Sequence, residues 1–122
     1  MKKPISPELH GVLDYTTAAT ATAASRLLRV SAPAARTAQA WAAGYSTLAA
    51  MTDYPLAVKR AVPFRTHGTI DKVLGVLLPA IPWMLGFARD RRGRNLFLGL
   101  AAVSIVVTAL TDWNAGRDAS AA

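Results

Sequence analysis

The chain has 122 residues, enough for one compact domain. Hydrophobic residues make up 52% of it and charged residues only 17%, whereas roughly a quarter of the residues in a soluble domain are charged. This balance favours a membrane protein or an unusually buried chain. Because the chain has no cysteine, a disulfide framework, a thiolate zinc site and a thiol nucleophile are all excluded.

The formal net charge of +7 would suggest a nucleic-acid partner in a soluble protein. In this chain, however, the basic residues stand in groups between apolar runs, as they do in loops that flank membrane helices. We therefore expect the lipid bilayer, and no nucleic acid, to be the partner of these charges. The groups are Arg26, Arg29 and Arg36; Lys59, Arg60 and Arg65; and Arg89, Arg91, Arg92 and Arg94.

Two helices are predicted in the first half of the chain. Residues 9–30 form the first, whose middle is rich in alanine and threonine and carries no charge. Such small residues let helices approach closely in a bilayer. Pro33 suits the first turn of a second helix over 34–52. That helix should end before Pro55, because the residue before a proline is pushed out of helical geometry.

Two more helices are predicted after a connection over 53–66. Residues 67–88 form the third, in which Pro79 and Pro82 each remove a backbone hydrogen bond and are expected to kink the helix. Residues 95–112 form the fourth, which has apolar residues on every face and so lacks the polar stripe of a soluble amphipathic helix. At ~1.5 Å per residue, its length nearly matches a ~30 Å hydrocarbon core.

These elements predict an all-α protein, a four-transmembrane-helix bundle built from two tandem helical hairpins in a single domain over 1–122. A soluble four-helix bundle is the alternative, because the first two helices are only modestly hydrophobic. The bundle is expected to contain a parallel internal repeat, with one copy over about 8–54 and the other over about 65–113. Tandem hairpins place the two copies around a pseudo-two-fold axis along the membrane normal.

Two pairs of short motifs define this repeat. In each hairpin, the first helix begins with a His-Gly-x-x-Asp motif and the second helix ends with a Thr-Asp-aromatic motif. Two tandem hairpins place all four motifs at one membrane face. They are His10-Gly-Val-Leu-Asp14 with Met51-Thr52-Asp53-Tyr54, and His67-Gly-Thr-Ile-Asp71 with Leu110-Thr111-Asp112-Trp113.

The acidic residues of these motifs have different expected roles. Asp14 and Asp71 lie one helical turn after a histidine and at a helix N-terminus, where a carboxylate is stabilised. Asp53 and Asp112 lie at helix C-terminal ends, where a carboxylate is unfavourable. We therefore expect each of these two to have a partner, either a histidine or an arginine such as Arg65.

Three functions are compatible with this pattern. The first is a non-catalytic structural or accessory subunit, in which a His–Asp–Asp network rigidifies a bundle with little hydrophobic driving force between its helices. The second is binding of a metal ion, or passage of ions or protons, because imidazole with carboxylates suits zinc, manganese or iron and intramembrane carboxylates mark ion paths. The candidate ligands are His10, Asp14, Asp53, His67, Asp71 and Asp112.

The third function is haem ligation by both histidines, which the sequence places at the same depth in the first and third helices. We expect no catalytic residues, because the chain has no glycine-rich phosphate loop and no serine nucleophile motif. No cofactor is required by the sequence; a divalent metal comes before haem among the alternatives. The sequence is also compatible with assembly into a homo-oligomer or a larger membrane complex.

The segment Leu78-Pro79-Ala80-Ile81-Pro82-Trp83-Met84-Leu85-Gly86-Phe87 resembles the SPW-repeat group of small bacterial membrane proteins. Those proteins carry Ser-Pro-Trp and an apolar Gly-Phe after a His-x-x-x-Asp helix start. Here Ile81 replaces the serine, and Ser25-Arg26 stands at the aligned place in the first repeat. The resemblance covers most of 5–113 in pattern. It implies an integral protein of the bacterial cytoplasmic membrane and assigns no chemistry.

The basic loops over 26–36 and 89–94 have almost no acidic residues to offset them, so we expect them to face the cytoplasm. The His/Asp motifs and both termini would then face the periplasm. A reporter fused at Ala122 that reads as cytoplasmic would contradict this orientation.

Overall fold

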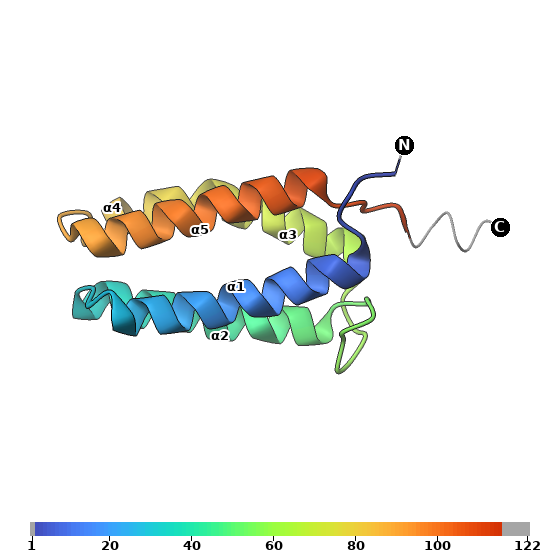
Figure 1. Cartoon of the computed structure of the whole chain (residues 1–122), viewed down its shortest axis with the longest axis horizontal. Coiled ribbons are helices and arrows are strands. Elements are labelled where there is room, and N and C mark those ends of the chain that lie inside the picture. Colours follow the sequence, from blue (N-terminus) through green and yellow to red (C-terminus); the bar gives the residue numbers. More distant parts are fainter. Residues whose placement is uncertain (1, 116–122) are drawn as a thin grey trace.

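The computed structural model describes residues 2–115, and within this range the protein is all-helical, with four helical segments and no strand. Figure 1 shows two helical hairpins lying side by side along the long axis. The all-α prediction is therefore confirmed. The segments are α1 (Pro7–Leu27), α2 (Ala32–Met51), α3 (Phe64–Leu77) continued by η1 (Leu78–Ala80) and α4 (Ile81–Met84), and α5 (Arg91–Leu110).

The first two helices begin at serine caps. The Ser6 hydroxyl accepts a hydrogen bond from the backbone N–H of Leu9, and the Ser31 hydroxyl accepts one from Ala34. In each case a proline occupies the first turn, where its missing N–H costs nothing. Serine and proline together therefore fix where α1 and α2 start.

The third helical segment is interrupted where the prolines were expected to kink it. The α-helical pattern of α3 changes to a 3-10 turn at Leu78–Ala80 and then resumes for one turn in α4. Pro79 and Pro82 lie in these two short elements, and a proline in a helix interior removes a backbone hydrogen bond. Leu78, in the 3-10 turn, and Phe87, which follows α4, both belong to the buried core.

Small side chains hold the first hairpin together. Alanines of α1 and α2 are almost completely buried against one another, which allows the two backbones to approach closely. The larger core residues come from the second hairpin, and Phe97 of α5 is fully buried among them. The buried core consists of Ala18, Ala21, Ala34, Ala38, Ala42, Leu78, Phe87, Phe97, Leu100 and Ala101.

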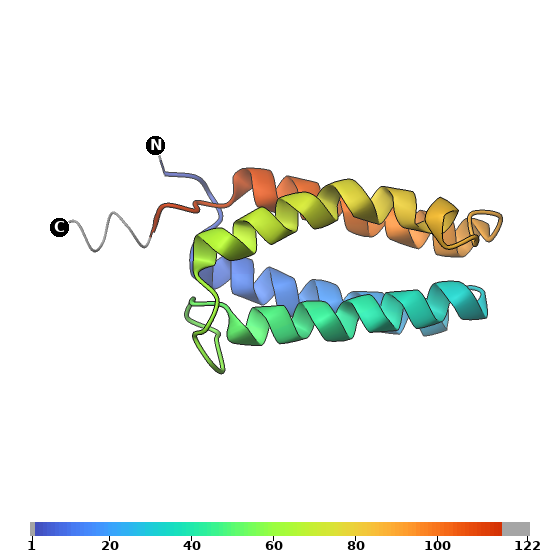
Figure 2. The same ribbon diagram turned by 180° about the vertical axis from the view of Figure 1, so that it is seen from behind.

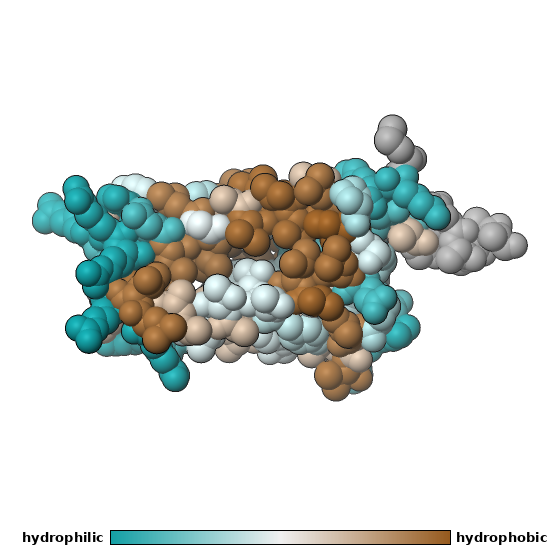
Figure 3. All heavy atoms as spheres, viewed as in Figure 1, coloured by the Kyte–Doolittle hydropathy of each residue, from teal (hydrophilic) through white to brown (hydrophobic). Residues whose placement is uncertain are grey.

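One helix of the described chain, α5, is long and apolar enough to cross a membrane by length and composition. The other three do not meet that standard: α1 and α2 are rich in alanine and threonine, and α3 has only 14 residues. Many large apolar side chains nevertheless point outward, among them Val76, Trp83 and Val106. Figure 3 shows an apolar and weakly polar middle between two hydrophilic ends.

The end of the bundle where α1 begins and α5 ends is closed by two short backbone pairings. Ile5 pairs with Thr111 at the end of α5, and Thr52 at the end of α2 pairs with Val62 in the connection before α3. Figure 2 shows this connection, the start of α1 and the end of α5 at the same end of the bundle. Each pairing places a threonine opposite a residue that stands five positions before a histidine: Ile5 precedes His10, and Val62 precedes His67.

Asp90 joins the two hairpin turns at the opposite, basic end. Its Oδ2 accepts a hydrogen bond of 2.7 Å from the backbone N–H of Ser31. Burial raises the pKa of Asp90, but hydrogen bonds from the backbone N–H groups of Ser31 and Gly93 outweigh this and bring the pKa below its usual value. A carboxyl group whose pKa is lower in the folded state stabilises the fold above its unfolded pKa, and this stabilisation is lost as the pH falls through the folded pKa.

We therefore expect Asp90→Asn to lower the Tm at neutral pH. The difference from the unmodified protein should shrink below about pH 4, where the carboxyl group of the unfolded chain and then that of the folded chain become protonated. Circular dichroism melts of both proteins at a series of pH values measure this difference. A difference that stays constant from about pH 7 down to about pH 2 would show that the charge of Asp90 has no role.

Gly93 marks a close approach of α5 to α2. A Cβ at residue 93 would lie 2.6 Å from the Cβ of the buried Ala34 and would also clash with the carboxylate of Asp90. We expect Gly93→Ala to lower the free energy of unfolding by about 1–3 kcal/mol. Gly99→Ala, on the same helix, is the matched control, because nothing lies within 4 Å of its added Cβ and alanine is the better helix former. Equal melting temperatures for the two variants would contradict this packing.

Candidate metal centre

Four of the predicted site residues meet at the closed end of the bundle. His10 and Asp14 lie one turn apart on α1, and His67 and Asp71 lie one turn apart on α3. One ligand atom from each lies within 4.8 Å of the other three. The four side chains are 0–4% exposed. We call them the His–Asp cluster.

A threonine fixes the proton of each histidine. The Thr52 hydroxyl donates to the backbone carbonyl of Leu48 at 2.6 Å, so its oxygen accepts from Nδ1–H of His67 at 2.7 Å. Thr111 does the same for His10, donating to Val107 at 2.6 Å and accepting from Nδ1–H at 2.8 Å. With the proton held on Nδ1, each neutral imidazole has a lone pair on Nε2.

The two Nε2 atoms point toward the middle of the cluster. They lie 3.3 Å from each other. His10 Nε2 lies 3.2 Å from Asp14 and 3.1 Å from Asp71, and His67 Nε2 lies 3.2 Å from each carboxylate. Zinc bonds of about 2.0–2.1 Å in a regular tetrahedron put neighbouring ligand atoms about 3.3–3.4 Å apart. The two Nε2 atoms and Asp71 Oδ2 therefore have the spacing of three corners of a tetrahedral site, and Asp14, which turns Oδ1 to His10 and Oδ2 to His67, offers the fourth ligand.

The charge of the cluster requires positive charge at its centre. Two carboxylates and two neutral imidazoles sum to −2, and an uncompensated charge buried from water is very unfavourable. Protonation of both Nε2 atoms would neutralise the cluster, but it would point two N–H groups of like charge at each other across 3.3 Å. One divalent cation between the four ligands supplies the same charge without that repulsion.

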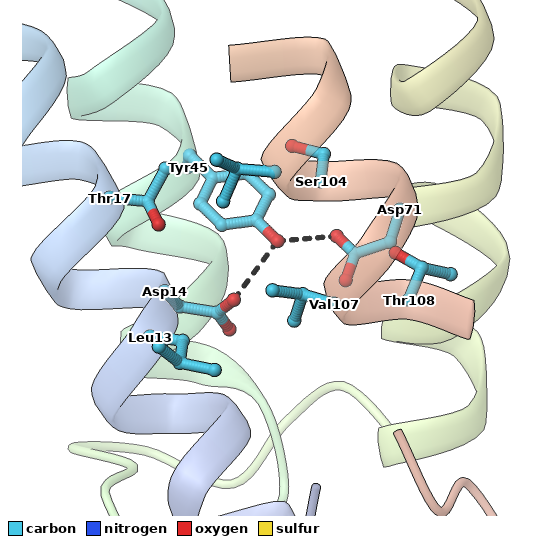
Figure 4. A pocket seen from close by; sticks show the side chains of 9 residues that line it. Leu13, Asp14, Thr17, Tyr45, Asp71, Ser104, Val107 and Thr108 are labelled. Carbon is cyan, nitrogen blue, oxygen red and sulfur yellow. Dashed lines mark hydrogen bonds between the residues drawn. The ribbon is translucent and has the colours of Figure 1, made fainter. Parts of the chain in front are cut away.

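Two tyrosines orient the carboxylates. The Tyr45 hydroxyl, from α2, lies 2.5 Å from Asp71 Oδ1 and 3.1 Å from Asp14 Oδ1, and so bridges the hairpins (Figure 4). The Tyr54 hydroxyl donates to Asp14 Oδ2 at 3.2 Å. Burial and the negative charge of Asp14 raise the pKa of Tyr54, so its hydroxyl keeps the proton that it donates. Such partners hold metal-binding carboxylates in place.

A small cavity of about 10 Å³ lies beside the Tyr45 bridge, between this bridge and the part of α5 that contains Val103 and Ser104. It is about the size of one water molecule. Hydroxyl-bearing residues line part of it, among them Thr17, Ser104 and Thr108 (Figure 4).

Aromatic rings cover the cluster at the end of the bundle. The ring of Trp113 lies 4.8 Å from that of His10, and Phe64 packs on both, at 4.7 Å from Trp113 and 5.7 Å from His10. The glycine after each histidine makes room for this cover. A Cβ at Gly68 would lie 2.8 Å from the Trp113 ring, and one at Gly11 would lie 3.1 Å from the ring of Tyr54.

The other two predicted ligands lie outside the cluster. Asp53 is exposed and lies 3.5 Å from Arg60, and Asp112 accepts a hydrogen bond from the backbone N–H of Asn114. Asp53 therefore has an arginine partner, as expected, but this partner is Arg60 and not Arg65. For Asp112 the structure shows a backbone N–H in place of the expected histidine or arginine. The residue that connects each Thr-Asp-aromatic motif to a histidine is the threonine, because its hydroxyl faces inward where the helix ends. Of the aspartates that follow, Asp53 is exposed and Asp112 is half-buried.

The geometry does not suit haem ligation by the two histidines. Iron bonds to two opposite imidazoles would place the two nitrogens about 4 Å apart, with the porphyrin plane between them, if each bond is about 2 Å. In this structure the Nε2 atoms of His10 and His67 are 3.3 Å apart and two aspartates fill the space around them.

Sequence reasoning did not assign roles to four residues of the site. Tyr45 was visible only as one aromatic among many alanines, and Tyr54 as the last residue of its motif. Thr52 and Thr111 were part of the repeated motifs, and their equal spacing from the motif aromatics was the available signal. Comparison of the chain with protein-family models, with curated proteins and with solved structures found no match. The SPW-repeat resemblance therefore stays a prediction.

Proposed function

We propose that this chain is a small, non-catalytic integral membrane protein in which one divalent metal ion, bound by the His–Asp cluster, fastens two helical hairpins together. His10 and Asp14 would supply two ligands from the first hairpin, and His67 and Asp71 would supply two from the second. Tetrahedral sites in which the protein provides all four ligands are the structural kind, whereas catalytic sites keep a position open. A zinc ion fits this donor set best, with iron or manganese as alternatives.

The observation that carries this proposal is the threonine contact of each imidazole, from which we infer the position of the ring proton. Thr52 and Thr111 accept from Nδ1, so both Nε2 lone pairs face two carboxylates at 3.1–3.2 Å. Electron-rich atoms from four side chains held this close favour a cation between them. The rings of Phe64 and Trp113 cover the cluster at the end of the bundle, which supports a structural centre over a reactive one.

Titration with Co²⁺ tests the site directly. Tetrahedral cobalt absorbs visible light far more strongly than six-coordinate, hydrated cobalt does. We expect one equivalent of Co²⁺ to produce strong visible bands, and Zn²⁺ to displace it. Weak bands only, or none, would contradict a tetrahedral site.

The second candidate function is a metal-free structural network, in which protons take the place of the cation. The Tyr45 bridge between Asp14 and Asp71 favours it, because this bridge already connects the hairpins without a metal. The two candidates differ in one measurable respect. A metal-free network predicts a purified protein that contains no stoichiometric metal and melts at the same temperature in the presence and absence of a chelator.

Loss of the threonine contacts should weaken metal binding. Thr52→Val and Thr111→Val remove the acceptors for the two Nδ1–H groups, and we expect each to lower metal affinity by about 10–100-fold, as loss of such partners does in other metal sites. Thr47→Val is the matched control on α2: its hydroxyl also donates to the carbonyl four residues back, but it is exposed and contacts neither histidine. Competition with a fluorescent zinc chelator measures the affinities. Equal affinity in all three variants would contradict the role of the threonines.

The proposed location is the bacterial cytoplasmic membrane, with several membrane passes and with the His–Asp cluster end facing the periplasm. The outward-facing apolar side chains of α3 and α5 and the two hydrophilic ends of the bundle (Figure 3) support this placement. Membrane pellets washed at alkaline pH should retain the protein. Reporter fusions at Lys2 and Ala115 should both read as periplasmic; release into the wash, or a cytoplasmic reading, would contradict the placement.

A further inference from the structure

An open groove of about 560 Å³ runs along the seam between α1 and α5, from the basic end of the bundle to Leu13, Thr17 and Val103, which also line the small cavity beside the Tyr45 bridge. Its α1 wall is formed by threonines such as Thr16 and Thr20, and its α5 wall by apolar residues such as Leu96 and Val103. Gly99 widens it, because nothing lies within 4 Å of a Cβ added there. Figure 3 shows the face on which α1 and α5 lie and the hollow between them.

The groove has one basic end. Arg92 and Asn95, in the first turns of α5, lie at this end together with Leu28. The Arg92 guanidinium donates to the carbonyl of Leu28 at 3.2 Å, which fixes it across the mouth, and this contact uses one of its five N–H donors. The Arg94 side chain donates to Asn95 at 3.5 Å and so lies beside the same mouth.

The length of the groove fits one leaflet of a bilayer. From Arg92 to Val103 the α5 helix rises about 16 Å, at ~1.5 Å per residue. Half of a ~30 Å hydrocarbon core is ~15 Å. A single acyl chain that entered from the basic face would therefore reach the middle of the membrane along this groove.

We propose that the groove between α1 and α5 binds a phospholipid with an anionic head group, its acyl chain along the groove and its phosphate at Arg92 and Arg94. The charge at this end of the bundle favours an anionic head group, because seven arginines and only one acidic residue, Asp90, occur in and beside the two hairpin turns there. A guanidinium binds phosphate oxygens through paired, charge-assisted hydrogen bonds. This inference rests on the proposed membrane location but not on the metal.

The test compares phosphatidylglycerol with phosphatidylcholine of the same acyl chains, each added to the full chain in detergent. Native mass spectrometry should show one phosphatidylglycerol retained per chain, at least about tenfold more than phosphatidylcholine, as expected for hydrogen bonds between charged groups. Gly99→Leu, which fills the groove, and Arg92→Gln combined with Arg94→Gln should each abolish this preference. Gly44→Leu, where added atoms also meet open space, and Arg36→Gln, an exposed arginine at the same end, should keep it.

Two results would overturn the inference. One is equal retention of the two lipids by the unmodified protein. The other is an unchanged preference for phosphatidylglycerol in Gly99→Leu, which would place the lipid elsewhere on the basic surface. Either result, for a protein that remains in alkaline-washed membranes, would leave the proposed membrane location and metal centre intact. Release from the membranes would instead contradict the proposed location itself.

Discussion

Replacing His67 with alanine should abolish stoichiometric metal binding and lower the free energy of unfolding by about 3–5 kcal/mol, the cost of leaving buried charges without their partner. His67 Nε2 lies 3.2 Å from both Asp14 and Asp71 and 3.3 Å from His10, so its loss removes one of four ligands and one of two imidazoles facing the carboxylates. Elemental analysis and thermal melts of the purified variant measure the two effects.

The controls for this variant are Asp53→Asn and Asp112→Asn. Both residues belong to the same repeated motifs, and both lie outside the His–Asp cluster. We expect each variant to bind metal like the unmodified protein. If these two lose metal as His67→Ala does, the ligands extend beyond the cluster and the assignment of the site is wrong.

Removal of the metal by a chelator should lower the Tm of the unmodified protein by roughly 10 °C or more. A ligand present at about 1,000 times its Kd stabilises the folded state by ~4 kcal/mol, and for a chain of this length 1 kcal/mol corresponds to roughly 3–5 °C. The effect is large because the metal-free cluster retains two carboxylates inside the protein, where negative charge is poorly tolerated. Differential scanning calorimetry in detergent measures it.

The same treatment of His67→Ala is the control for this prediction. A chelator acts on this variant only through other metal sites or through the detergent, so its Tm should not change. Restoring Zn²⁺ should return the Tm of the unmodified protein to its first value. Equal shifts in both proteins would show that the metal acts outside the His–Asp cluster.

Much of the architecture was predictable because it depends on local signals. Proline and serine residues mark helix ends, and Pro79 and Pro82 mark the interruption between α3 and α4. The length and uniform apolarity of the fourth helix predicted a segment able to cross a membrane, which α5 is. The first two helices gave a weaker signal, because alanine and threonine fit a helix interface in a membrane and in a soluble bundle equally well.

The cluster was predictable in part. The i,i+4 spacing of histidine and aspartate gave two correct pairs, and the order of tandem hairpins correctly placed both pairs at one end. The sequence did not show that Asp14 and Asp71 belong to the cluster while Asp53 and Asp112 do not. Asp53 and Asp112 lie just past helix ends, and whether such a side chain points into the bundle depends on how the chain leaves the helix. The Ile5–Thr111 and Thr52–Val62 pairings set that direction, and they connect segments distant in sequence or inside a loop.

Elemental analysis of the full chain, purified in mild detergent without added metal or chelator, tests the central claim most directly. We expect about one zinc, iron or manganese ion per chain, lost in His67→Ala and kept in Asp53→Asn. A protein that folds and melts cooperatively with no stoichiometric metal, before and after incubation with Zn²⁺, would contradict the metal centre.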